Sequence, residues 1–315
     1  MSAPLRILFA ALGYIPIPPV GYGGIESIIW EYTQRLRAKG HTVDIVNANK
    51  HRVFWEILKH GRYDFLHCHH ERGLSRMMAA NLFKGSRVIC TTHRGYFLDD
   101  IDHDAEKCLR MTARAPHIMV IREDVAAELR RRNPAAKVVV QPNGTEASQF
   151  RVAEKGNGRA ICLAMIEKRK RQDFIFEQVQ GLGIHVDFAG PLKEDILPPG
   201  ANFLGEWTRE TIREKLTEYT TLILVSDREG GGPPLVVAEA LAAGLNVVVS
   251  PMAYGNLDLT QPFIFPVERD EDFIPALQAS LGQEHRAQAR GYCEANFSWE
   301  VLTDRYEQQL LAWRS

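Results

Sequence analysis

The stretch Leu5-Arg6-Ile7-Leu8-Phe9-Ala10-Ala11-Leu12 is a short, almost continuous apolar run bounded by a proline and a glycine. Runs of this kind are typical of strands that are buried on both faces of a parallel sheet. Residues 25–38 follow with apolar side chains at helical spacing, and Gly40 provides a stop signal. Residues 42–46 then form a second short apolar run, so this part of the chain predicts a strand–helix–strand unit.

The same alternation of apolar runs and amphipathic stretches continues along the chain. Further strands are expected at residues 65–68, 88–91, 117–121, 137–141, 160–165, 185–188, 221–225 and 246–249. Helices are expected at residues 53–60, 74–83, 104–112, 124–132, 171–180, 208–219, 235–243 and 299–313. Alternation on this scale predicts an α/β protein with two successive parallel sheets, each covered by helices on both faces.

A domain boundary is expected near the middle of the chain. Pro142-Asn143-Gly144 is a turn signal, and residues 151–158 are polar and contain glycine. We therefore expect an N-terminal domain at residues 1–150, a second domain at 151–298 and a last helix at 299–315.

Composition excludes several classes of protein. The 315 residues are 45% hydrophobic, which is enough for a large core. Because 38 Lys plus Arg balance 39 Asp plus Glu, the protein has no overall basic field for nucleic acid. Five scattered cysteines without a C-x-x-C pair suit a reducing cytoplasm. No run approaches the ~18 apolar residues of a membrane-spanning helix, so at most peripheral membrane contact is expected.

A first glycine-rich motif, Gly21-Tyr22-Gly23-Gly24-Ile25-Glu26, lies between the first strand and the first helix. Glycines at this place let the backbone approach a ligand, and the free amides of a helix start face an anion. The alternative is a flexible turn. The motif lacks the dinucleotide fingerprint, and the second strand ends Val46-Asn47-Ala48-Asn49 without an acidic ribose clamp, which disfavours a nucleotide-dependent oxidoreductase.

A second glycine-rich segment, residues 227–244, reads Asp-Arg-Glu-Gly-Gly-Gly-Pro-Pro-Leu-Val-Val-Ala-Glu-Ala-Leu-Ala-Ala-Gly. Three glycines follow an apolar strand and lead into a helix, which leaves amides available for a diphosphate. A neighbouring carboxylate accepts hydrogen bonds from the hydroxyls of a sugar. The alternative is a Gly-Pro turn followed by an ordinary amphipathic helix.

Several landmarks in a fixed order together resemble glycosyltransferase family 4. They are Gly23-Gly24-Ile25-Glu26, Lys39-Gly40-His41-Thr42-Val43, Asn143-Gly144, Lys170-Arg171-Gln172-Asp173, Phe203-Leu204-Gly205, Glu239-Ala240-Leu241-Ala242-Ala243-Gly244 and Phe297-Ser298-Trp299. The resemblance implies a GT-B fold, in which two Rossmann-like domains with parallel sheets face each other across a cleft. It also implies a retaining, metal-independent enzyme whose last helix returns to the N-terminal domain.

The motifs and the resemblance assign roles to individual residues. Catalytic roles go to three side chains: His93, Lys170 and Glu229. Donor binding goes to glycines and to residues of one helix start: Gly23, Gly24, Gly230, Gly231, Gly232, Leu235, Val236 and Glu239. Lys170 matches the lysine that neutralises the diphosphate leaving group, and a fixed cation is what metal-free departure of a diphosphate requires. Glu239 matches the glutamate that holds the nucleotide ribose.

Two positions depart from the family pattern. Glu229 and Glu239 lie two residues further apart than usual, which puts Gly231 in the place of the first glutamate. Met165 stands where the family has an arginine, and Lys168, Arg169 or Arg171 are candidates to replace its charge. These departures put catalysis and sugar choice in doubt more than the fold.

Two clusters resemble metal sites but are interpreted otherwise. In His67-Cys68-His69-His70-Glu71, alternate residues of a strand end point to opposite faces and do not converge on one ion. His69 or His70 is instead a candidate for the acceptor side. Asp99-Asp100-Ile101-Asp102-His103-Asp104 contains D-x-D, but it precedes a helix, where acidic residues favour the helix start. No metal and no cofactor is expected.

The sequence thus predicts transfer of a hexosyl unit from a nucleoside-diphosphate sugar to a hydroxyl acceptor, with retention of configuration. The acceptor is a small molecule, a glycan or a lipid-linked molecule. A different class, a degenerate protein that binds a sugar nucleotide without catalysis, remains open because of Met165 and the stretched glutamate spacing.

Overall fold

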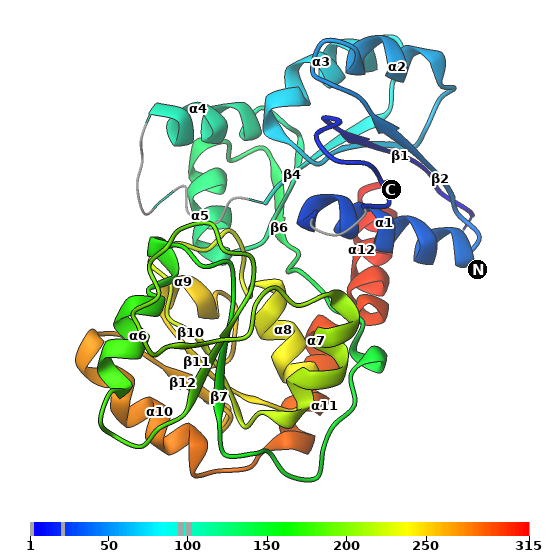
Figure 1. Ribbon diagram of the computed structural model, residues 1–315. Helices are drawn as coiled ribbons and strands as arrows, with labels where there is room; N and C mark the ends of the chain where they lie inside the picture. The colour runs from blue at the N-terminus through cyan, green and yellow to red at the C-terminus, as the bar shows by residue number, and fades with distance from the viewer. Residues whose placement is uncertain (1–2, 20–22, 94–97, 99–102, 315) are drawn as a thin grey trace. The chain divides into compact units, whose positions relative to one another are not determined.

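The computed structural model describes residues 3–19, 23–93, 98 and 103–314 (Figure 1). The chain divides into two compact units. Unit 1 contains residues 1–142 and 302–315, and unit 2 contains residues 143–301.

Among its described residues, unit 1 contains a six-stranded parallel sheet. In the order β2-β1-β3-β4-β5-β6, the strands are β2 (Thr42–Asn47), β1 (Arg6–Ala11), β3 (Phe65–Cys68), β4 (Arg87–Thr92), β5 (His117–Val120) and β6 (Lys137–Val140). The helices between them are α1 (Gly24–Ala38), α2 (Val53–Lys59), α3 (Glu71–Asn81), α4 (His103–Thr112) and α5 (Glu123–Arg132). The last helix, α12 (Trp299–Arg314), contributes its residues from Leu302 onward to this unit.

Strand alternation gives the sheet of unit 1 two apolar faces. Leu8, Leu66 and Cys90 belong to a core that the side chains of α2, α3, α4 and α5 complete. On the opposite face the ring of Phe9 packs against Tyr306 of α12, which in turn packs against Tyr32 of α1. Both faces of the sheet are therefore covered, as a parallel sheet requires.

Unit 2 repeats this plan among its described residues. In the order β12-β11-β10-β7-β8-β9, its parallel strands are β12 (Ile264–Pro266), β11 (Asn246–Val249), β10 (Thr221–Leu224), β7 (Ala160–Leu163), β8 (Val186–Ala189) and β9 (Asn202–Phe203). Its helices are α6 (Gln172–Val179), α7 (Arg209–Lys215), α8 (Leu235–Ala242), α9 (Pro251–Tyr254), α10 (Phe273–Leu281) and α11 (Arg286–Phe297).

Consecutive residues of the strands in unit 2 enter two different cores. Ile161 and Leu163 pack with α8 and α11 on one face, whereas Ala160 and Cys162 pack with α6 and α10 on the other. Figure 1 shows helices on both sides of this sheet. Each short apolar run is thus buried on both faces, which is why it reads as continuous rather than alternating.

The predicted α/β fold class is confirmed, and the predicted strands and helices occur with shifted ends. Helix 208–219 is shorter than expected, because regular α-helix ends at Lys215 and a 3-10 turn (Leu216–Glu218) follows. Two strands and three α-helices of the described residues were not predicted from the sequence: β9, β12, α9, α10 and α11. Within the described part of the chain, no helix is long and apolar enough to cross a membrane.

Candidate functional site

Each sheet reverses its strand order at one point, and polar side chains gather there in both units. In unit 2 the chain builds outward from β7 through β8 to β9 and then returns to place β10 on the other side of β7. The carboxyl ends of strands at such a reversal are where open α/β sheets bind ligands. Lys170 follows β7 and Glu229 follows β10, so the two residues come from the neighbouring strands of this point.

Lys170 and Glu229 form a buried ion pair between the ammonium Nζ and the carboxylate Oε1. Lys170 is 7% exposed and Glu229 6%. A second cation lies next to the pair: the Arg169 guanidinium donates to the Arg228 carbonyl and lies 3.9 Å from Glu229 Oε2. Arg169 is 42% exposed and pairs more closely with Glu167, over 2.5 Å, so of these two cations only Lys170 is buried. A buried cation of this kind suits an anion that replaces its carboxylate partner.

The glycine segment Gly230–Gly232 connects this ion pair to helix α8. Gly255 has a φ of +51°, and a Cβ added there would lie 2.1 Å from the Gly232 Cα. The two backbones therefore touch, and only glycine fits at residue 255. Leu235 and Val236 are the first two residues of α8, so their amides have no partner within the helix and are available to a ligand.

Glu239 lies inside α8 and is only 3% exposed. Its Oε1 accepts a hydrogen bond from Nη1 of Arg209, the first residue of α7, over 2.6 Å. Burial raises the pKa of Glu239, and the Arg209 charge opposes that rise. Arg209 thus favours the ionised carboxylate, which is the form that accepts two hydroxyl hydrogen bonds.

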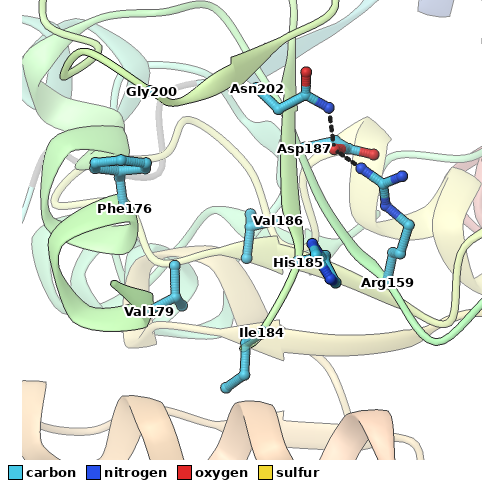
Figure 2. Close-up of a pocket in the computed structure, with 9 residues that line it drawn as sticks. All are labelled: Arg159, Phe176, Val179, Ile184, His185, Val186, Asp187, Gly200 and Asn202. Carbon is cyan, nitrogen blue, oxygen red and sulfur yellow. Dashed lines mark hydrogen bonds and ion pairs between the residues drawn. The ribbon is translucent and has the colours of Figure 1, made fainter. Parts of the chain in front are cut away.

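A separate cavity of about 270 Å³ lies at the other end of the same sheet (Figure 2). Its polar group Asp187 is near the start of β8 and pairs with Arg159, Asn202 and Tyr219. Because these partners already satisfy the carboxylate, we interpret the Asp187 cluster as structural.

In unit 1 the strand order reverses between β1 and β3. The loop after β1 leads to Gly23 and Gly24 at the start of α1. A Cβ added to Gly23 would lie 2.9 Å from the Pro19 Cβ, whereas one added to Gly24 meets no described atom within 4 Å. Gly24 therefore has room for a ligand in this unit, and Gly21 and Tyr22 of the same motif lie outside the described residues.

Histidines follow the next two strands of unit 1. His69 follows β3 and His93 follows β4, and Nδ1 of His69 lies 3.3 Å from Nε2 of His93. His67, within β3, stacks on His69 with ring centroids 4.1 Å apart. Its nitrogens contact the hydroxyls of Tyr306 and Thr91 over 2.7 and 2.6 Å.

Burial keeps these three imidazoles neutral. It lowers the pKa of His67 to about 3 and the pKa of His93 to about 4, and it holds the pKa of His69 well below its usual value. Repulsion from neighbouring imidazoles acts in the same direction, from within the cluster for His67 and His69 and from His70 for His93. Among the described residues, no group of three or more His, Cys, Asp or Glu side chains is arranged to hold a metal ion.

The structure thus brings Lys170 and Glu229 together in unit 2 and places Gly230–Gly232 between that pair and α8. Glu239 pairs separately with Arg209. Of the D-x-D segment, residues 99–102 lie outside the described part of the chain, and Asp104 pairs with Arg72 over 2.5 Å.

Sequence reasoning missed Arg209 and did not foresee the contact between His69 and His93. A signal for Arg209 was present, because a cation at a helix start opposes the helix dipole and needs a local anion. No short-range signal links His69 with His93, since only the pairing of β3 with β4 brings them together.

Comparisons with known proteins agree with this architecture. Residues 47–149 match the family model described as Glycosyltransferase Family 4. No curated protein matches the chain. Sucrose-phosphate synthase from Thermosynechococcus elongatus superposes with a TM-score of 0.78 at 15% identity, covering 98% of this chain and 99% of that one.

Two further solved structures are similar over nearly their whole lengths. Anabaena HepE in complex with UDP-glucose has a TM-score of 0.74 at 12% identity, covering 98% of this chain and 100% of that one. AviGT4, a glycosyltransferase involved in avilamycin A biosynthesis, has a TM-score of 0.70 at 16% identity, covering 99% of this chain and 98% of that one. The predicted GT-B fold is confirmed, and the predicted resemblance to glycosyltransferase family 4 is confirmed at residues 47–149.

Proposed function

We propose that this GT-B chain is a glycosyltransferase that moves a hexosyl unit from a nucleoside-diphosphate sugar to a hydroxyl acceptor. The buried Lys170–Glu229 pair carries the proposal, because it lies at the reversal point of the sheet and beside a glycine segment. Retention of configuration is what the resemblance to family 4 implies.

Lys170 is the residue that we assign to the diphosphate. Departure of a nucleoside diphosphate builds negative charge on its oxygens, and a fixed ammonium stabilises that charge in the transition state. Lys170 is held in place by Glu229. Arg169, which pairs with Glu167 and lies 3.9 Å from Glu229, is our candidate to supply the charge that Met165 does not. We therefore propose a metal-independent reaction in which these cations replace a metal ion.

The nucleotide is assigned to α8. Glu239, whose ionised form Arg209 favours, accepts hydrogen bonds from the two ribose hydroxyls, and the amides of Leu235 and Val236 bind phosphate oxygens. Glu229 lies next to Lys170, so we assign it to orient Lys170 as well as to contact the donor sugar. In unit 1, Gly23, Gly24 and His93 are assigned to the reacting sugar and the acceptor side.

The first experiment is a panel of UDP-, GDP-, ADP- and dTDP-sugars, measured by thermal stabilisation and by slow hydrolysis of the donor. UDP-glucose is the first donor to test, because HepE was solved with UDP-glucose. We expect one base to stabilise the protein by mass action and its sugar nucleotide to be hydrolysed.

Two outcomes contradict the proposal in different ways. Stabilisation by a sugar nucleotide without any hydrolysis or transfer would support the non-catalytic binding protein instead. A lack of stabilisation by every member of the panel would contradict the proposed donor site itself.

We also propose a cytoplasmic location, which the five free, buried cysteines suit.

A further inference from the structure

The contact between His69 and His93 requires one hydrogen to lie between two neutral rings. A neutral imidazole carries hydrogen on one nitrogen and a lone pair on the other. Because His69 Nδ1 and His93 Nε2 are 3.3 Å apart, one of them donates and the other accepts. The arrangement of the two inner nitrogens therefore fixes the state of the two outer ones, His69 Nε2 and His93 Nδ1.

Two arrangements satisfy this contact. In the first, His69 Nδ1–H donates to His93 Nε2, so His93 carries its hydrogen on the outer Nδ1. In the second, His93 Nε2–H donates to His69 Nδ1, so His69 carries its hydrogen on the outer Nε2. Both outer nitrogens are buried, and neither has a hydrogen-bond partner among the described residues.

Burial decides between the two arrangements. A buried N–H without a partner costs more than a buried acceptor without one. His69 is 2% exposed and packs between His67 and Phe9, whereas His93 is only partly buried at the end of β4. Both outer nitrogens are shielded as atoms, but His93 is the more exposed residue of the two, so we place the unpaired N–H on His93.

We propose that His69 is a positioning residue that holds His93 with its hydrogen on Nδ1. His93 then presents a hydrogen-bond donor, not a base, to a hydroxyl oxygen of the bound sugar. His67 supports this arrangement, since its two hydroxyl contacts fix the ring on which His69 stacks. The ligand part of the inference rests on the proposed function, whereas the position of the hydrogen does not.

The hydrogen positions are measured directly by long-range ¹⁵N–¹H correlation spectra of the full chain with ¹⁵N-labelled histidine rings. The ring signals are assigned from His69→Asn and His117→Asn variants. We expect His69 and His93 both to carry hydrogen on Nδ1, without any added ligand. Hydrogen on Nε2 of His93 would overturn the proposal, whatever reaction the protein catalyses.

Kinetics of the active protein separate a positioning role from a packing role. His69→Phe keeps an aromatic ring but removes the donor, and we expect kcat to fall about tenfold or more with a smaller change in KM. His69→Asn restores an N–H near the position of Nδ1 and should recover most of that loss. His117→Asn removes another buried histidine of the same sheet, outside the pair, and should leave kcat unchanged.

Equal kcat values for His69→Phe and His69→Asn would overturn the positioning role. A wild-type protein that transfers no sugar would instead contradict the proposed function, and the spectra would still decide where the hydrogens lie.

Discussion

The two units both contain a parallel sheet whose strand order reverses once, but they bury polar groups in opposite ways. Each places polar side chains at the carboxyl ends of its strands, where the strand order reverses. Unit 2 keeps its groups charged and pairs them, as in Lys170 with Glu229 and Glu239 with Arg209. Unit 1 keeps the cluster of His67, His69 and His93 neutral by burial.

This difference indicates what each unit is suited to bind. A buried ion pair binds a charged group such as a diphosphate when that group replaces one of the two paired residues. Neutral imidazoles donate and accept single hydrogen bonds without bringing charge into the site, which suits sugar hydroxyls.

Removing the charge of Lys170 should have the largest effect. Lys170→Met leaves Glu229 buried without its main partner, which we expect to cost ~3–5 kcal/mol of unfolding free energy. Turnover should fall about 100-fold or more, because the cation for the leaving group is lost. Urea unfolding and donor hydrolysis measure the two effects separately.

The double variant Lys170→Met with Glu229→Gln is the matched control. It removes both charges, so most of the lost stability should return while turnover stays low. A double variant with recovered turnover would show that Lys170 acts only on the fold.

Acid should destabilise the fold of unit 1 through the buried cluster of His67, His69 and His93. Their pKa values are depressed in the folded state, so the unfolded chain binds more protons between about pH 6.5 and the folded values, about 4 for His93 and about 3 for His67. Stability is therefore fully present above pH 6.5 and is lost as the pH falls through that window. Within that window, each of these histidines should lower the unfolding free energy by up to about 1.4 kcal/mol for every unit by which the pH falls.

Hydrogen exchange of the β3 and β4 amides between pH 7 and pH 5 reports this loss locally. His69→Asn should show a shallower dependence on pH than the wild type, because one titrating group is gone. Parallel curves for the two proteins would contradict the assignment of the pH dependence to this cluster.

Removal of Arg209 should weaken nucleotide binding about tenfold to 100-fold, since a hydrogen bond to a charged group contributes ~1.5–3 kcal/mol. Without Arg209 the pKa of the buried Glu239 rises further, because burial raises it and only the charge of Arg213 is left to lower it. In Arg209→Leu, affinity for the nucleotide should fall, and fall more as the pH decreases and the carboxylate is protonated. Arg209→Lys keeps a cation there and should show little pH dependence.

Calorimetric titration of the nucleotide from the donor panel at several pH values measures this effect. If Arg209→Leu weakens binding equally at every pH, Arg209 contacts the nucleotide directly instead of acting through Glu239.

The fold followed from local pattern to a large extent. A strand such as β7 is a continuous apolar run because both of its faces are buried, and that signal is visible in a single short segment. β9 has two residues and β12 ends in a proline, so neither is long enough to show a pattern. In α11 many surface positions are polar, so its few buried residues, Ala289 among them, were not recognised as the apolar face of a helix.

The site was predictable where it follows a local motif and not where it depends on pairing across the sheet. The glycine segment and Glu239 were recognised because strand, glycines and helix are consecutive in the sequence. Arg209 is thirty residues from Glu239 in the sequence, and His69 is twenty-four from His93. Contacts over such separations depend on strand order, which composition and periodicity do not encode.

Substitutions of two neighbouring glycines at the start of α1 should have smaller effects than the changes above. Gly23→Ala places a Cβ 2.9 Å from the Pro19 Cβ and should cost ~1–3 kcal/mol of unfolding free energy through overpacking. Gly24→Ala meets no described atom within 4 Å, and alanine restricts the unfolded chain more than glycine, which contributes ~0.4–1 kcal/mol. Its stability should therefore be equal or slightly higher, as thermal unfolding would show. If Gly24→Ala nonetheless weakens the binding of the sugar nucleotide, the space above Gly24 is where the donor phosphates approach, and unit 1 contributes to the donor site. Unchanged binding would restrict the donor to the charged groups of unit 2.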